Sequence, residues 1–209
     1  MIEQSLGNLV IVDATTGGGK TSLVKELVKR VKDLEISISH TTRDQRPGEV
    51  AGVHYFFVAA KHFLNMVETH QFIEHARVFE HDYGTSRAQI EVRLQAGVDV
   101  ILDIDWQGAS QIKQSFSNAV SIFILPPSIT ILENRLTNRK RDHAEVIQAR
   151  MRHAREQMSH YKDFDYLIVN DCFEQALEEL TAIITAQRLQ LKRQMIKQRK
   201  LLSLLLGTK

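Results

Sequence analysis

Close to its start the chain sets an apolar run, a cluster of glycines and a helical pattern in direct succession, and few folds accommodate this order. The apolar run covers residues 8–13, the glycines are residues 17–19, and apolar side chains recur at helical spacing over residues 20–34. Glycine permits backbone angles that other residues resist, so we expect a tight turn between the run and the helix. The stretch therefore predicts a buried strand that passes through a glycine-rich turn into a helix.

This turn is predicted to bind phosphate. Where a strand leads into a helix, backbone N–H groups and the helix N-terminus face an anion. Lys20 can reach the outer phosphates of a nucleotide, and the hydroxyl of Thr21 can ligate Mg²⁺. The alternative is a flexible turn with a chance Gly-Lys-Thr, and the flanking strand and helix argue against it. The loop residues expected at the phosphates are Ala14, Thr15, Thr16, Gly17, Gly18, Gly19, Lys20 and Thr21.

Two residues at the start of this loop are unusual for a phosphate site. Ala14 occupies the first glycine position of the pattern G-x-x-x-x-G-K-[ST], where a small side chain is enough to begin the turn. Asp13 precedes it, and a carboxylate beside a triphosphate repels it unless the side chain points away. We interpret the loop as a working nucleotide site in spite of both residues.

Apolar strands continue to alternate with helices along the rest of the chain. Further strands are expected at residues 35–40, 98–105, 119–127 and 164–171, and one long helix with a basic end is expected from residue 173. This alternation predicts an α/β fold whose parallel sheet is covered by helices on both faces.

A more polar segment, residues 38–90, interrupts the alternation. It combines short strands at residues 53–58 and 72–79 with a short helix at residues 61–70. We expect it to form an inserted lobe.

Composition narrows the class of protein further. The 209 residues fit one globular unit, 43% of them are hydrophobic, and a net charge of +2 gives no reason to expect a nucleic-acid partner. Cys172 is the single cysteine, which excludes an intramolecular disulfide and a cysteine-based zinc site, and we expect it to be a small buried side chain. No secretory signal and no bilayer-length apolar run is visible, so a cytoplasmic location without a membrane partner is expected.

Two carboxylates mark the end of the strand expected at residues 98–105. Ligands of open parallel sheets bind beside the carboxyl ends of the strands, and alternation points Asp103 and Asp105 to the same side. One of them can hold Mg²⁺ through water, and the other can accept a proton from a ligand. The alternative is a carboxylate that caps a helix or a turn.

The loop-rich start of the inserted segment carries Ser39, Arg43, Arg46 and Tyr55. Arginine side chains match phosphate oxygens in pairs, so two of them beside a tyrosine can clamp a second phosphate group. On these residues alone, a solvated charged loop is an equal alternative.

Longer motifs identify a family. The stretches "TTRDQRPGEVAGVHYFFV", "FIEHARVF", "YGTSRAQIE", "ILDIDWQGA", "FILPPS" and "VNDCFEQALEEL" resemble the guanylate kinase family in order and spacing, from about residue 8 to about residue 190. The resemblance implies transfer of the γ-phosphoryl group of ATP to GMP, giving ADP and GDP, with Mg²⁺. It also implies a nucleotide-binding core at residues 1–37 and 91–209, with a lid at about 128–158, and a GMP-binding lobe at residues 38–90.

The resemblance implies roles for individual residues. The residues that resemble ligands of the GMP phosphate are Arg43, Arg46, Tyr55 and Tyr83. Those that resemble readers of guanine are Ser39, Glu74 and Thr85, with Asp103 or Asp105. A carboxylate suits guanine, which presents N1–H and N2–H₂ as adjacent donors, whereas adenine has no such pair.

On the ATP side, Arg135 resembles the residue that lies against adenine, and Arg139 and Arg150 resemble the pair that reaches the transferring group. Mg²⁺ is implied at Thr21, with a water-mediated contact to one of the two aspartates. Phosphoryl transfer needs in-line placement and neutralised charge, and Lys20, Arg46 and the lid arginines supply that charge. No general base is expected, because a GMP phosphate oxygen is already nucleophilic. Closure of the lid and lobe is expected to exclude water.

Several residues depart from the family pattern, which affects rates and affinities. They are Asp13, Ala14, Asp82, Trp106, Lys140 and Arg141. Two other functions stay open: a protein-binding module that keeps this fold without catalysis, and a kinase that acts on a phosphorylated sugar. Lys20 and Thr21 argue against the first, and Glu74 with the tyrosines argues against the second.

The basic end of the chain, "RLQLKRQMIKQRKLLSLLLGTK", extends past the resemblance. RNA, an anionic membrane and another subunit all fit a basic amphipathic helix. We favour a solvated helix whose leucines pack on the core or on a second copy of the chain. The partners expected are therefore ATP and GMP, and a homo-oligomer through this helix is one of the two arrangements that would cover its leucines.

Overall fold

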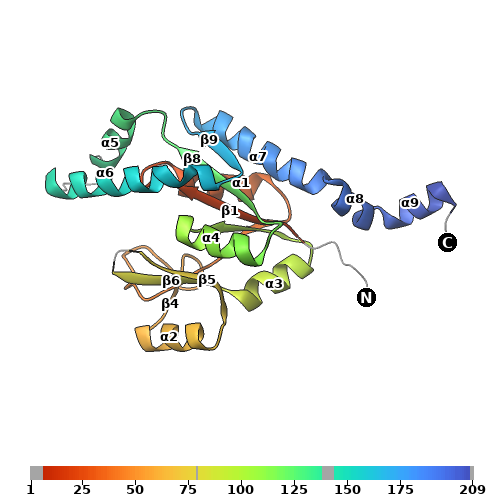
Figure 1. Cartoon of the computed structure of the whole chain (residues 1–209), viewed down its shortest axis with the longest axis horizontal. Helices are drawn as coiled ribbons and strands as arrows, with labels where there is room; N and C mark the ends of the chain where they lie inside the picture. The colour runs from red at the N-terminus through yellow and green to blue at the C-terminus, as the bar shows by residue number, and fades with distance from the viewer. Residues whose placement is uncertain (1–6, 79, 138–143, 208–209) are drawn as a thin grey trace.

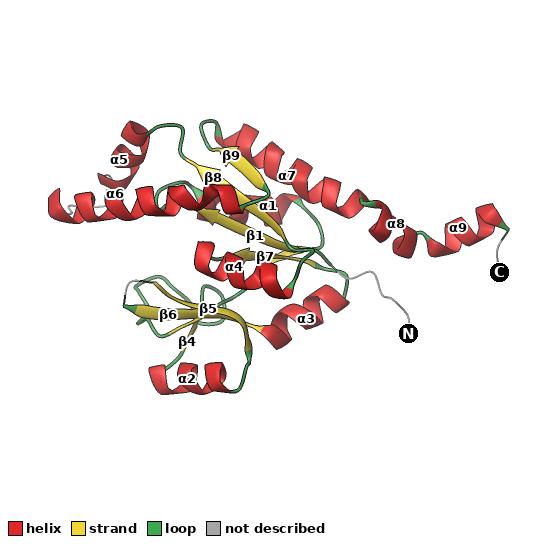
Figure 2. Cartoon of the chain, in the orientation of Figure 1, coloured by secondary structure: helices red, strands yellow, loops and turns green. Residues whose placement is uncertain are grey.

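The computed structural model describes residues 7–78, 80–137 and 144–207, which form two sheets with helices packed around them (Figure 1, Figure 2). The larger sheet has the strand order β2-β7-β1-β8-β9, and all neighbouring strands are parallel. Its strands are β1 (Leu9–Ala14), β2 (Leu34–Ile36), β7 (Asp99–Asp103), β8 (Val120–Leu125) and β9 (Tyr166–Val169). The expected α/β fold with a parallel sheet is confirmed.

Helices cover both faces of this sheet because its central strands are apolar on both sides. In β1, Val10 and Val12 pack on one face, while Leu9 and Ile11 pack on the other. The helices of the first face are α1 (Lys20–Arg30) and α7 (Phe173–Leu189), and those of the second are α3 (Arg87–Gln95) and α4 (Trp106–Ser115). The sheet is thus buried from both sides, and its strand ends hold the loops of the site.

A smaller sheet with the order β4-β3-β6-β5 lies below the larger one in Figure 1. Phe63, Met66 and Phe72 form a separate small core between this sheet and α2. The elements are β3 (His40–Thr41), β4 (Phe56–Phe57), α2 (Ala60–Glu68), β5 (Phe72–Val78) and β6 (His81–Ser86). This sheet has a small core of its own, and Ile73 of β5 also packs into the core on the second face of the larger sheet.

Two helices, α5 (Ile129–Thr137) and α6 (Ala144–Ser159), pack on each other at one end of the molecule through Leu132, Leu136 and Ala154. A 3₁₀ helix, His160–Asp163, connects α6 to β9. At the opposite end in Figure 1, α8 (Leu191–Lys197) and α9 (Arg199–Leu206) project away from the body.

Two expected elements are interrupted. The strand expected at residues 35–40 divides, because the ladder with β7 ends at Ser37 and the chain then crosses to the smaller sheet, where His40 pairs with Gly84. The long helix expected from residue 173 breaks at Gln190 and again at Gln198.

A buried carboxylate accounts for the first break in that helix. Asp99 is fully buried and accepts from the Arg188 side chain at 2.7 Å and from the Arg193 side chain at 3.0 Å. The extended backbone of Gln190 (φ −54°, ψ 136°) lies between the two arginines and turns the chain, so both reach one carboxylate. The tail is therefore fixed as far as Arg193, and beyond it Leu201, Leu204, Leu205 and Leu206 are exposed.

Cys172 is exposed at the start of α7, so the expectation of a buried side chain was wrong. It is the N-cap residue of α7 and precedes the first residue of that helix that packs into the core, Ala176. The hairpin strand β6 was not expected, because the polar residues 81–86 carry no alternating apolar pattern.

Candidate functional site

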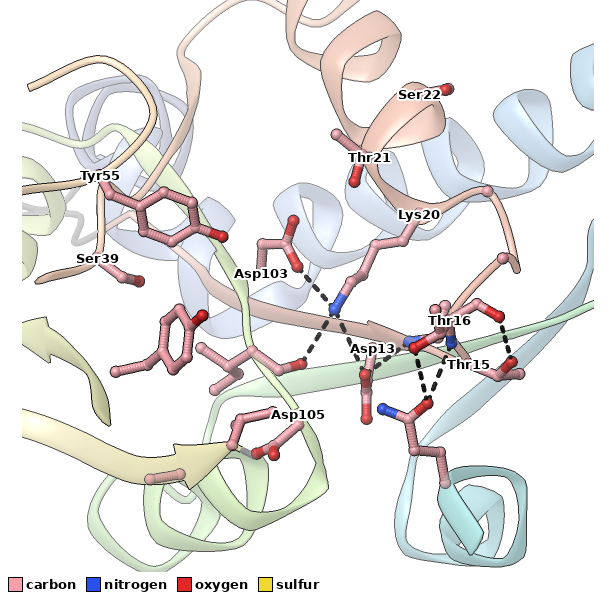
Figure 3. Close-up of a pocket in the computed structure, with 18 of the residues that line it drawn as sticks. Asp13, Thr15, Thr16, Lys20, Thr21, Ser22, Ser39, Tyr55, Asp103 and Asp105 are labelled. Carbon is pink, nitrogen blue, oxygen red and sulfur yellow. Dashed lines mark hydrogen bonds and ion pairs between the residues drawn. The ribbon is translucent and has the colours of Figure 1, made fainter. Parts of the chain in front are cut away.

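A cavity of about 320 Å³ lies between the carboxyl ends of β1 and β7 and the smaller sheet (Figure 3). Residues from both sheets and from α6 line it. They are Asp13, Ala14, Thr15, Thr16, Gly17, Gly19, Lys20, Thr21, Ser22, Ser39, Tyr55, Glu74, Ala76, Val78, Tyr83, Asp103, Ile104, Asp105 and Gln157. The cavity therefore joins most of the residues expected at the phosphate loop with several of those expected in the inserted lobe.

The glycine-rich loop needs its glycines. Gly17 and Gly19 have left-handed φ values of 90° and 95°. A Cβ on Gly17 would lie 3.0 Å from a Leu132 methyl, and one on Gly19 would lie 2.2 Å from the Asn170 side-chain nitrogen. Because Gly19 supplies no side-chain cap, the first turn of α1 leaves its N–H groups open to an anion.

Lys20 is held by carboxylates in the cavity. Its Nζ lies 2.7 Å from Asp103 Oδ1, 3.4 Å from Asp13 Oδ1 and 3.5 Å from the Ile104 carbonyl oxygen. These two carboxylates raise the pKa of Lys20 despite the opposing effect of burial, so the side chain is a fixed positive charge. A phosphate that binds Lys20 must compete with both.

Asp13 is buried, at 1% exposed, and lines the cavity rather than pointing away from it. Its Oδ1 accepts the Ala14 N–H at 2.7 Å, whereas Oδ2 has no hydrogen-bond partner among the described residues. Burial raises the pKa of this carboxyl, and the charge of Lys20 opposes that rise. A buried, half-satisfied carboxylate thus sits directly beneath the phosphate loop.

Asp103 and Asp105 both line the cavity but occupy different local structures. Asp103 ends β7, and its side chain is 34% exposed beside Lys20. Asp105 lies beyond the strand as the N-cap of α4, where Oδ1 accepts the N–H groups of Gln107 and Gly108, each at 3.1 Å. The expectation that both lie on the strand was therefore wrong for Asp105, and its capping alternative describes it.

Glu74 is the buried carboxylate at the other end of the cavity. It is 4% exposed on β5, and its Oε1 accepts a hydrogen bond from the Thr85 hydroxyl. The Ser39 hydroxyl lies 3.4 Å from that of Thr85. Burial raises the pKa of Glu74 to about 7, although the bonds from Thr85 lower it. Three of the residues expected to read a base therefore meet here.

Gly108 lets Glu74 approach α4. A Cβ on Gly108 would lie 2.7 Å from Glu74 Oε2. The carboxylate thus lies against the first turn of the helix that Asp105 caps.

The expected phosphate ligands of the inserted lobe divide into two groups. Tyr55 and Tyr83 line the cavity, with ring centroids 5.9 Å apart. Arg43 is buried behind Tyr55, where it pairs with Glu49 at 2.8 Å, and Arg46 is exposed outside the cavity lining. Glu49, which holds Arg43, was not expected from the sequence.

Two of the arginines expected at the donor nucleotide, Arg135 and Arg150, are absent from the cavity lining. Arg135 donates to the Asn170 carbonyl oxygen at 3.3 Å. Arg150 lies half-buried on α6, and Arg139 lies outside the described residues.

Two residues missed by the sequence analysis contact the phosphate loop. The Gln157 side-chain oxygen on α6 accepts the Thr16 N–H at 3.1 Å, and the Asn170 side chain donates to the Gly18 carbonyl oxygen at 2.8 Å. No local pattern marks either residue in the sequence, because the two contacts span 141 and 152 residues.

The cavity can accommodate Mg²⁺ in the way a nucleotide carries it. Mg²⁺ keeps several waters and takes one or two carboxylates together with phosphate oxygens. Thr21, Asp103 and Asp105 face the same cavity, while the described residues contain no cluster of three or more metal-ligating side chains. The donor set therefore fits a phosphate-bound ion rather than a protein cage.

Among the described helices, none is long and apolar enough to cross a bilayer.

Comparisons with known proteins agree with this architecture. The guanylate kinase family model matches residues 6–187. The chain is 56% identical to guanylate kinase of Legionella pneumophila (strain Paris) over 208 residues, which is 100% of both chains. It is 53% identical to guanylate kinase of Coxiella burnetii over 183 residues, covering 88% of this chain and 89% of the relative.

A solved structure of a guanylate kinase has a similar fold. The crystal structure of guanylate kinase from Anaplasma phagocytophilum matches with a TM-score of 0.77 and 31% identity, covering 97% of each chain. The match supports the α/β fold with its parallel sheet and helices. The chain belongs to the guanylate kinase family.

Proposed function

We infer that the chain transfers the terminal phosphoryl group of ATP to GMP, giving ADP and GDP. One observation carries this proposal beyond family membership: a single cavity holds a phosphate loop with Lys20 at one end and buried Glu74 at the other. Guanine offers N1–H and N2–H₂ side by side to a carboxylate, and adenine has no such pair of donors. The cavity thus has a place for each of the two nucleotides.

The donor side binds the phosphates of ATP. The open N–H groups of the loop and of the first turn of α1 bind phosphate oxygens, and Lys20 exchanges its carboxylate partners for them. Thr21, with Asp103 or Asp105 through water, would hold Mg²⁺, which would supply positive charge to the phosphates. Arg135 lies against the adenine ring.

The acceptor side binds GMP. Glu74, Thr85 and Ser39 hold the guanine edge, with Asp103 or Asp105 near it, and Tyr55 and Tyr83 hold the phosphate. Arg43 and Arg46 complete that phosphate site once the lobe of residues 38–90 closes. Arg43 is already oriented by Glu49, whereas Arg46 is exposed and must move inward.

The chemical step requires alignment and charge. A GMP phosphate oxygen attacks in line, so no side chain has to remove a proton from it. Lys20, Arg46, Arg139 and Arg150 supply positive charge around the transferring group. The lid at about residues 128–158 closes over the core and excludes water that would otherwise hydrolyse ATP.

The two alternatives are weaker. A protein-binding module has no need of Lys20, Thr21 and loop glycines at positive φ. A sugar-phosphate kinase has no use for the buried carboxylate of Glu74, which suits the N–H donors of guanine. A coupled assay of ADP release with GMP, AMP, CMP and ribose phosphates separates all three. We expect turnover with GMP and at most weak turnover with the others; turnover with none would overturn the proposal.

We also infer that the chain works in the cytoplasm and self-associates through its last helices. Leu204, Leu205 and Leu206 on α9 are 72–81% exposed, which favours burial against a second copy. Light scattering on the wild type and on Leu204→Glu tests this, and a wild-type monomer at assay concentration would contradict it.

A further inference from the structure

One polar contact joins α6 to the phosphate loop across 141 residues of sequence. The Thr16 N–H donates to Gln157 Oε1 at 3.1 Å, and the Thr16 hydroxyl lies 3.5 Å from the same oxygen. Gln157 is 8% exposed and lines the cavity, so this contact lies at the wall of the donor site. Among the described residues no other side chain of α6 lines the cavity.

The contact fixes a part of the loop that is otherwise free to turn. Thr16 precedes Gly17, whose left-handed φ of 90° places it among the most permissive residues of the loop. Leu132 packs behind Gly17, and Asn170 fixes the Gly18 carbonyl, whereas Gln157 is the one partner of the Thr16 N–H within the described ranges. Without it, the Thr15–Thr16 peptide loses the partner of its N–H on the cavity side.

Gln157 is itself held in place from two directions. Ala154 and Met158, on either side of it in sequence, pack against the leucines of α5. Three residues after Gln157, the His160 ring stacks on the Trp106 ring of α4, with centroids 3.8 Å apart and planes 7° apart. The end of α6 is therefore anchored, and the Gln157 amide reaches the loop from a rigid support.

We propose that Gln157 is a positioning residue for the donor site: its side-chain oxygen holds the Thr16 N–H so that the loop is ordered for the phosphates of ATP. This rests on the assignment of the loop to ATP made above. Gln157 orders the loop before ATP binds. Loss of the Gln157 contact should therefore weaken ATP binding and leave GMP binding unchanged.

Three variants test the proposal. Gln157→Leu removes the acceptor at similar volume. Gln157→Glu keeps an acceptor for the Thr16 N–H, although it also adds a negative charge to the wall. Glu156→Gln is the matched control, since Glu156 is 65% exposed beside Gln157 and pairs only with His153 among the described residues. Each is measured for ATP KM, GMP KM, kcat, binding of a non-hydrolysable ATP analogue, and amide exchange of the loop.

We expect Gln157→Leu to raise the ATP KM and the Kd of the analogue about tenfold, equivalent to about 1.4 kcal/mol, with faster amide exchange at residues 14–21 and an unchanged GMP KM. Gln157→Glu restores both ATP constants to within about threefold of wild type, and Glu156→Gln matches wild type. If Gln157→Leu binds the analogue as wild type does, or raises both KM values equally without rescue by glutamate, the proposal is wrong. If wild type itself fails to bind the analogue, the donor-site assignment fails instead.

Discussion

The two ends of the cavity each carry a buried carboxylate, and the surroundings of the two differ. Asp13 is 1% exposed and lies 3.4 Å from the Lys20 ammonium, whereas Glu74 is 4% exposed and is bonded by the neutral Thr85 hydroxyl. Burial raises the pKa of both carboxyls, and only Asp13 has a cation beside it to oppose that effect. At the donor end, the charges of Lys20 and its carboxylates are therefore already paired. At the acceptor end, the Glu74 carboxylate has no cation beside it and can accept hydrogen bonds from the N–H groups of a base.

Removing the cation from the donor end should have the largest effect. We expect Lys20→Met to lower kcat by about 10²–10³-fold or more, because a charge on the transferring group is lost. It should also lower the melting temperature, since Asp13 and Asp103 lose their shared partner. Steady-state kinetics and thermal unfolding measure the two effects.

The double variant Lys20→Met/Asp13→Asn separates catalysis from stability. Asparagine removes the buried charge, so the melting temperature should recover while activity stays low. Recovered activity in the double variant, or near-normal turnover in Lys20→Met alone, would show that Lys20 is not at the transferring phosphate.

At the acceptor end, Glu74→Gln should weaken the use of GMP and leave the ATP KM nearly unchanged. The loss of a charge-assisted pair with guanine is about 1.5–3 kcal/mol, which is roughly ten- to a hundredfold in KM. The assay should be run at pH 8, where the Glu74 carboxylate is ionised. Glu68→Gln, a change of an exposed glutamate on α2, is the control, and equal losses for both nucleotides would contradict the role of Glu74.

The same glutamate should make stability depend on pH. Its pKa is about 7 in the folded chain against an ordinary value of 4.5, so the folded state holds the proton over a window in which the unfolded state has lost it. Stability should therefore fall as the pH rises from about 4.5 to 7, by an amount on the order of 3 kcal/mol. Urea unfolding across this range should give a flatter profile for Glu74→Gln than for wild type; parallel profiles would show that Glu74 does not titrate there.

A smaller effect is expected for Asp13→Asn. Asparagine keeps an acceptor for the Ala14 N–H but removes a negative charge from the cavity wall. Lys20 then has one carboxylate competitor fewer, although Asp103 remains 2.7 Å away. We expect the ATP KM to fall about two- to fivefold with an unchanged GMP KM. A rise in the ATP KM would mean that Asp13 orders the loop rather than competing with phosphate.

The smallest effect is expected for Ala14→Gly. Ala14 lies in β1 with a negative φ, so its methyl group begins the loop without strain. Glycine adds freedom to the unfolded chain and lowers the stability by roughly 0.5–1 kcal/mol, while ATP KM and kcat stay within a few-fold. A large gain in ATP affinity would show instead that the alanine obstructs the loop.

The order of strands and helices was predictable from sequence because β1, β7, β8 and β9 each contain an apolar run of three or four residues. The loop with Lys20 could be found from sequence because its strand, turn and helix follow one another directly in the chain. Where a strand or helix ends earlier than expected, the cause is a contact with a residue far away in the sequence. Residue 37 pairs with β7 while His40 pairs with the smaller sheet, and Arg193 bends the tail toward Asp99.

Contacts between remote segments were the part that sequence could not supply. Gln157 and Asn170 reach the loop across 141 and 152 residues, and each is an ordinary polar residue within its own element. Asp105 alternates with Asp103 in sequence, but the strand ends between them, so its carboxylate is used to cap α4. Local spacing predicts which residues gather at a strand end, and it does not predict their hydrogen-bond partners.

The stacked rings at the end of α6 have a spectroscopic consequence. Trp106 is the only tryptophan in the chain, and its ring lies flat on the His160 ring, 3.8 Å away. Light that excites tryptophan alone therefore reports from one place, the junction of α4 with the segment that leads out of α6. Any rearrangement that slides or separates the two rings changes the emission of the unlabelled protein, so nucleotide titrations can be followed optically without an added dye.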